Sequence, residues 1–134
     1  MTTNAIRLLA ATVIFGQIAA FALPAHAQSG FVQVASGQSK RVDAYLGWNN
    51  DCSQMSINID VVGKPRHGTL SHRFVTETIR KASIGGVKNC YGKKVRALAL
   101  YYKSKRGYRG SDSFSVRIST GGKPANYNYN IAVR

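Results

Sequence analysis

The segment 101–109, Tyr-Tyr-Lys-Ser-Lys-Arg-Gly-Tyr-Arg, is the part of the sequence whose residue types most clearly suggest chemistry. Cations and tyrosines gather there, at the end of an apolar run and in the turn that follows. Lysine and arginine bind phosphates, carboxylates and glycan anions, and a tyrosine ring can support a ligand or an arginine side chain. We therefore predict an anion-binding surface with the candidate residues Tyr102, Lys103, Lys105, Arg106, Tyr108 and Arg109.

The same segment also fits a solvated basic turn that only keeps the protein soluble. The chain has 19 Lys and Arg residues against 5 Asp and Glu, a formal net charge of +14. This charge is spread over other turns too, at Lys40-Arg41, Lys64 to Arg66, Arg80-Lys81 and Lys93-Lys94 to Arg96. A charge of this size constrains partners rather than fold, and it favours an anionic polymer or surface.

Catalytic and metal-binding constellations are not evident in the sequence. His67 and His72 would point to opposite faces of one strand, so they cannot easily share a metal. The acids are scattered, and none forms the paired carboxylates of a glycoside hydrolase. A triad assembled in space from one of these histidines, Asp60 or Glu77, and a serine stays open, which keeps a hydrolase as the least favoured alternative. We expect no enzyme activity, cofactor or metal.

The two cysteines, Cys52 and Cys90, allow only one intramolecular pairing. In an exported chain they should form a disulfide, which closes a loop of about 39 residues and stabilises the fold by about 4 kcal/mol on the chain-entropy estimate. A redox or metal-binding pair usually has C-x-x-C spacing, which is absent here. Trp48, close to Cys52, is either an exposed ring that stacks on a ligand or a cap over this disulfide, and we expect the cap.

Residues 1–27 read as a secretory signal peptide. Arg7 precedes an apolar run from Leu8 to Leu23, and Pro24 and the triplet Ala25-His26-Ala27 follow it. This order predicts cleavage after Ala27 and a periplasmic or secreted protein formed by residues 28–134, with no integral membrane segment. Cleavage removes a single basic residue, so the net charge falls by one unit only.

The rest of the chain alternates between apolar and polar residues with a period of two, the pattern of half-buried strands. It is clearest at 55–61, 114–119 and 127–133, where Tyr127 and Tyr129 should face the core with their hydroxyls at the rim. The run 95–102 is almost entirely apolar, as in a central strand covered on both sides. Weaker strands are expected at 31–34, 41–46 and 69–75, and 76–84 is interpreted as a loop. About seven strands separated by turns predict an all-β sandwich.

Two motifs resemble those of bacterial cadherin-like and immunoglobulin-like tandem repeats. Residues 65–70, Pro-Arg-His-Gly-Thr-Leu, resemble the family's P-x-H-G-T-[LV] hairpin start, and 102–114 resembles its Y-x-P-x-x-G-[FY]-x-G-x-D-x-F segment, with Ser104 in place of the proline. The resemblance implies an immunoglobulin-like or cadherin-like sandwich and assigns turn and fold roles to Pro65, His67, Gly68, Thr69, Gly107, Gly110, Asp112 and Phe114. Among these, Asp112 should accept hydrogen bonds from backbone amides in the bend before its strand.

Members of that family serve as adhesive or binding modules, some of them with calcium between repeats. Here there is one copy, its cysteines resemble those of small exported single-domain relatives, and its scarce acids argue against calcium. We therefore expect a non-enzymatic exported module that associates through basic loops with an anionic cell-envelope or extracellular polymer. The alternative is a structural or protein-interaction subunit of an envelope assembly, which would use a sheet edge or an apolar patch.

Overall fold

The computed structural model describes residues 28–80 and 90–134, so the predicted leader lies outside the described part. Seven strands follow one another along it, with no α-helix in these two ranges. The strands are β1 (Gln28–Val34), β2 (Ser39–Tyr45), β3 (Ile57–Gly63), β4 (Gly68–Thr78), β5 (Lys94–Ser104), β6 (Gly110–Thr120) and β7 (Lys123–Val133). Each predicted strand is present, and the all-β prediction is confirmed.

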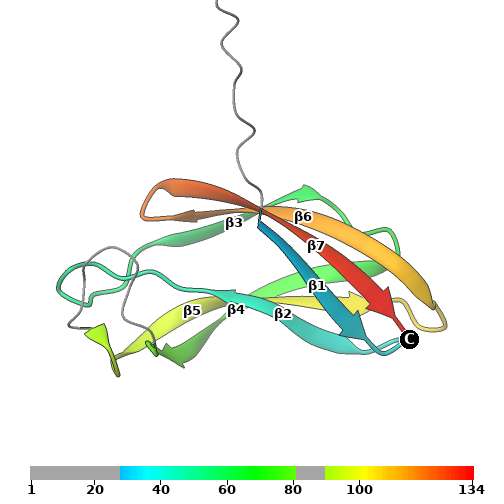
Figure 1. Cartoon of the computed structure of the whole chain (residues 1–134), viewed down its shortest axis with the longest axis horizontal. Coiled ribbons are helices and arrows are strands. Elements are labelled where there is room, and N and C mark those ends of the chain that lie inside the picture. Colours follow the sequence, from blue (N-terminus) through cyan, green and yellow to red (C-terminus); the bar gives the residue numbers. More distant parts are fainter. Residues whose placement is uncertain (1–27, 81–89) are drawn as a thin grey trace, which may run out of the picture.

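The strands form two sheets, with the orders β1-β7-β6-β3 and β2-β5-β4. β1 runs parallel to β7, and every other neighbouring pair is antiparallel. The two sheets are stacked as layers (Figure 1). The chain changes sheet between β1 and β2, β2 and β3, β3 and β4, and β5 and β6, whereas β4–β5 and β6–β7 are antiparallel pairs within one sheet. This order is that of an immunoglobulin-like sandwich, and it confirms the predicted β-sandwich.

The core lies between the sheets because the alternating strands turn their apolar faces inward. Phe114, Val116 and Ile118 of β6 lie in one cluster with Leu98 and Leu100 of β5. β5 is also covered on its other face, where Ala97 and Ala99 are fully buried, as predicted for a central strand.

A hydrogen-bonded group of polar side chains lies within this core. Tyr129 is 4% exposed, and its hydroxyl donates to Asp43 Oδ2 at 2.7 Å and contacts the hydroxyl of Tyr45. Burial raises the pKa of both tyrosines. The ring of Tyr129 faces inward as expected, but its hydroxyl is paired in the interior rather than at the rim.

The loop expected from Thr76 onward is wrong at its start, because β4 continues to Thr78. Residues 76–78 pair with residues 94–96 of β5, and Glu77 forms an ion pair with Arg41 of β2 at 2.7 Å. Strand pairing therefore outweighs the weak alternation of this stretch. The remainder of the expected loop, from residue 81, lies outside the described residues.

The disulfide between Cys52 and Cys90 is present, with a Cα–Cα distance of 5.4 Å. It joins the β2–β3 connection to the turn before β5. Cys90, Ile79 and Val95 form a second small core, against which Trp48 packs. The predicted pairing is confirmed, and it closes the end of the sandwich opposite to the basic turn that the next section describes.

Candidate anion-binding site

The predicted basic segment forms the turn between β5 and β6, at the end of the sandwich where the chain terminates (Figure 1). The β1–β2 and β3–β4 connections lie at the same end. Lys105 N donates to His67 O at 2.8 Å, Ser104 N to Gln38 O at 3.0 Å, and Gly107 N to Ser36 Oγ at 2.9 Å. These bonds join the basic turn to both neighbouring loops.

Asp112 fixes the β3–β4 loop to the first residues of β6. Its carboxylate accepts hydrogen bonds from the backbone amides of Arg66 and His67, at 3.0 and 2.9 Å, and from the Tyr102 hydroxyl at 2.8 Å. Burial disfavours the charged form, but these donors and the amide of Ser113 outweigh it and hold the pKa of Asp112 below its ordinary value. Asp112 is only 8% exposed, and its carboxylate is fully engaged by hydrogen-bond donors of the protein itself.

An aromatic contact fixes the β5–β6 turn from the other side. The rings of His67 and Tyr108 stack with their centroids 3.9 Å apart and 5° between their planes. The Tyr108 hydroxyl donates to Ser111 O at 2.7 Å. Gly107 has a φ of 80°, which favours glycine at this position of the turn. The two loops therefore present their side chains from a fixed backbone.

Between these loops lies a shallow pocket of about 400 Å³, which contains the main cations of the site. Its lining includes Arg66 of the β3–β4 loop, Lys103 near the end of β5, and Lys105 and Arg106 of the β5–β6 turn, and all four are exposed. The other lining residues are neutral side chains, His67 and Gly68. Such a site can hold a phosphate, sulfate or carboxylate group through several charge-assisted hydrogen bonds.

The structure brings together only some of the predicted site residues. Lys103, Lys105 and Arg106 line the pocket, whereas Arg109, the last residue of the turn, is exposed but does not line it. Tyr108 has one ring face covered by His67. Tyr102 is fully buried and so takes no part in the exposed surface, and burial together with its bond to Asp112 raises the pKa of its hydroxyl.

Arg66 is the pocket residue that the sequence did not assign to the site. It is 37 positions before Lys103 in the chain, and its loop is brought beside the β5–β6 turn by the hydrogen bonds to Asp112, by the bond from Lys105 N to His67 O and by the β4–β5 pairing. The sequence offered one indication of this role, because Arg66 stands next to His67 in the motif at 65–70. Gly68 also belongs to this arrangement, since any side chain there would collide with the ring of Tyr102.

The remaining motif residues occupy the positions that a hairpin start and a bend require. Pro65 precedes the amides that bind Asp112, and Thr69 pairs with Lys103 in the β4–β5 ladder. Gly110 has a φ of 138°, and Phe114 is in the core.

Several cations of the described residues lie at this end, which we call the basic end and define by Lys40, Lys64, Arg66, Lys103, Lys105, Arg106 and Arg109. Its single acidic side chain is the fully engaged Asp112, beside the chain's C-terminal carboxylate. The opposite end carries Arg80, Lys93, Lys94 and Lys123 among the described residues. Within residues 28–80 and 90–134 the one salt bridge is Arg41 to Glu77, so the cations of the basic end have no carboxylate partner there.

The residues of the hydrolase alternative do not form a hydrogen-bonded triad. His72, Asp60 and Ser119 line one groove of about 550 Å³ between the edges of β3 and β4. No side-chain hydrogen bond joins any two of them in the described part of the chain, and Glu77 is paired with Arg41 on the outside of the other sheet. The described residues also include no group of three or more His, Cys, Asp and Glu side chains placed to hold a metal ion.

Comparison with known proteins gives no family for the chain. No family model and no curated protein matches it. Among solved structures, one similar chain is the solution structure of Amebosin, which is 11% identical, covers 81% of this chain and 99% of its own length, and has a TM-score of 0.38. That score is too low to carry an argument. In the described residues, no helix has the length and apolar character needed to cross a membrane.

Proposed function

We propose that this protein is an exported, non-enzymatic binding domain that associates through its basic end with an anionic polymer of the cell envelope or the extracellular space. The observation that carries the proposal is the pocket in which Arg66 of one loop meets Lys103 of β5 and Lys105 and Arg106 of the following turn, without an acid among its lining residues. Charges of one sign in a concave surface raise the local concentration of the opposite ion.

The fixed backbone beneath this pocket supports the proposal. Asp112 fastens the loop that carries Arg66, and the stacking of His67 on Tyr108 fastens the turn that carries Lys105 and Arg106. Binding then costs mainly the ordering of the long cationic side chains, since the loops are already in place. Individual exposed contacts are weak, so affinity for a polymer requires several of them acting together.

Export is supported by the leader-like residues 1–27 and by the disulfide, because disulfides persist mainly in oxidising compartments. The cadherin-like resemblance supports a binding role as well. The amides that donate to Asp112 belong to the first motif and the aspartate belongs to the second, so the two motifs contact each other in this fold.

The second candidate is a subunit of an envelope assembly that docks through a sheet edge. The observation that favours it is the apolar character of the β3 edge, where Val61 and Val62 are 45% and 59% exposed. An edge strand offers unpaired backbone groups to a partner strand.

Salt dependence separates the two candidates. Binding of the exported protein to immobilised polyphosphate, and to neutral dextran as a control, is measured from low to high ionic strength. We expect retention on polyphosphate that falls steeply with salt, and none on dextran. Failure to bind polyphosphate or any other anionic polymer at low salt would refute the proposal, and salt-resistant capture of an envelope protein would favour the assembly role.

A further inference from the structure

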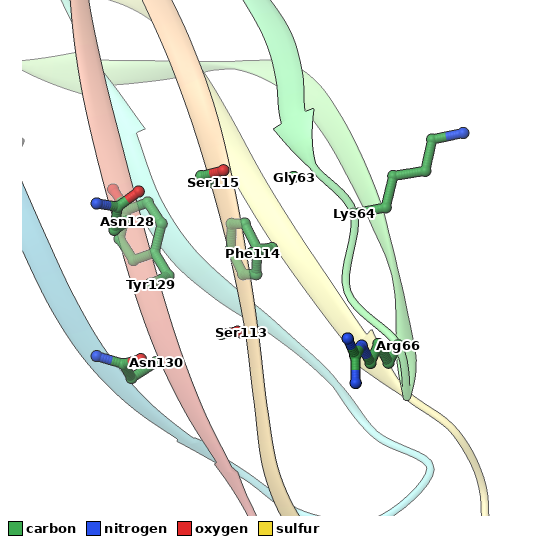
Figure 2. Close-up of a pocket in the computed structure, with 9 residues that line it drawn as sticks. All are labelled: Gly63, Lys64, Arg66, Ser113, Phe114, Ser115, Asn128, Tyr129 and Asn130. Atoms are coloured by element: carbon green, nitrogen blue, oxygen red, sulfur yellow. The ribbon is translucent and has the colours of Figure 1, made fainter.

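A second pocket adjoins the basic end on the outer face of the β1-β7-β6-β3 sheet. It has a volume of about 420 Å³ and lies where β3 ends while β6 and β7 continue (Figure 2). Its lining side chains include Ser113, Ser115, Asn128, Asn130 and Arg66. Arg66 also lines the anion pocket, so the two hollows are adjacent.

The register of β6 and β7 places the four neutral polar side chains in one compact group. Ser113 is opposite Asn130, and Ser115 is opposite Asn128. The two asparagines project from β7 along the same edge of the pocket in Figure 2. Within residues 28–80 and 90–134, no side-chain hydrogen bond engages any of the four. Their amide and hydroxyl groups are therefore available to a ligand.

Gly63 keeps this group accessible. A Cβ atom built at Gly63 would lie 2.6 Å from Ser115 Oγ, so a larger residue would press on the serine and fill the hollow. The irregular pairing between Val61 and Gly63 places Gly63 directly opposite Ser115. Glycine thus leaves this space open, and its backbone has no positive φ.

The chemistry of this pocket differs from that of a simple phosphate site. Asparagine amides and serine hydroxyls each donate and accept hydrogen bonds, which matches the hydroxyl groups of sugar rings. Phosphate groups only accept, so the acceptor atoms of the pocket would have no partner on a polyphosphate. Phe31 on β1 is opposite Asn130 and 65% exposed, and it offers an apolar face to the C–H side of a sugar ring.

We propose that this pocket binds the sugar rings of a carboxylate-bearing polysaccharide, whose acidic groups reach Arg66 and the cations of the basic end. This inference rests on the proposed function, because it names the class of anionic polymer. In Figure 2 the Arg66 guanidinium lies on the side of its loop that faces β6, whereas Lys64 extends away. Arg66 is therefore the residue that connects sugar binding with charge binding.

The test compares polygalacturonate, which has sugar rings and carboxylates, with polyphosphate, which has charge alone. The exported protein is assayed beside the double variant Asn128→Ala/Asn130→Ala and the single variant Phe31→Ser. We expect both variants to lose about tenfold in affinity for polygalacturonate, as for the loss of one or two ligand hydrogen bonds or a stacking contact, and to bind polyphosphate unchanged. The unchanged polyphosphate affinity also shows that the variants fold.

The matched control is Asn58→Ala/Asn126→Ala, which removes two exposed asparagines from the same sheet outside the pocket. It should leave both affinities unchanged. If the pocket variants bind polygalacturonate as the parent does, or if the parent binds polyphosphate but not polygalacturonate, the inference is overturned and the proposed function stands. If the parent binds neither polymer, the proposed function itself fails.

Discussion

The hydroxyl of Tyr102 donates a hydrogen bond to Asp112 Oδ2 at 2.8 Å, inside the sandwich. The same oxygen accepts from the amide of His67. One carboxylate thus joins the end of β5, the start of β6 and the β3–β4 loop. The position of the anion pocket depends on this junction.

Replacing Tyr102 with Phe should destabilise the domain without abolishing its fold. Asp112 keeps its amide donors but loses one hydrogen bond to a charged acceptor, which corresponds to about 1.5–3 kcal/mol in the free energy of unfolding. Urea denaturation measures the change. Tyr101→Phe is the control, because the Tyr101 hydroxyl accepts only an exposed bond from Arg73 at 3.2 Å, and its loss should be nearly neutral.

Acid should weaken the domain through Asp112. Because its pKa is lower in the folded state than in the unfolded state, its contribution is present above the unfolded pKa, about 3.9, and is lost as pH falls through the folded pKa. Urea unfolding between pH 7 and pH 2 should show this loss, and Asp112→Asn should lower stability at pH 7 and flatten the acid dependence. A variant whose acid dependence matches that of the parent protein would show that other groups cause it.

Loss of the disulfide should destabilise the fold but spare the anion site. The bond closes a loop with a sequence separation of 38 residues, and removing it by Cys52→Ser/Cys90→Ser should cost about 2–5 kcal/mol. Binding to polyphosphate under conditions where the variant is folded should be unchanged, since the cysteines lie at the end opposite to the basic end. Weakened binding by folded variant protein would contradict this separation.

Cleavage of the leader should occur between Ala27 and Gln28, because Ala25 and Ala27 are the small residues that a leader peptidase requires. The intact mass of the exported protein reports the site. An exported species that retains residues 1–27 would refute the cleavage prediction.

The strands were predictable because alternation reflects a local requirement, namely one buried and one exposed face. The run 55–61 gave the position of β3, and the apolar run 95–102 gave a central strand. Sequence alternation failed to predict the structure of residues 76–78. Their own sequence is ambiguous, and they belong to β4 because they pair with β5.

The site was only partly predictable, since it depends on contacts between distant segments. The cations of 103–106 were visible as a cluster, but Arg66 joins them through contacts between distant segments, namely the bonds to Asp112 and from Lys105 N to His67 O. Tyr102 is buried, and its hydroxyl is bound to Asp112 rather than exposed at the surface. The second pocket, which we propose binds sugar rings, could not be predicted from the sequence. It depends on the pairing register of β6 and β7, which places Ser113 opposite Asn130. The available signal was the repeated asparagine at alternate positions of β7.

The most direct test of the anion-binding proposal replaces Arg66, Lys103, Lys105 and Arg106 together by Ser, beside a control that replaces Arg80, Lys93, Lys94 and Lys123. Both variants lose four positive charges, but only the first loses the cations that line the pocket. If each pocket cation makes one phosphate-like contact, the log–log salt slope for polyphosphate binding should fall by about 3–4 in the pocket variant, and much less in the control. Equal losses in the two variants would show that net charge alone drives binding and that the basic end is not a site.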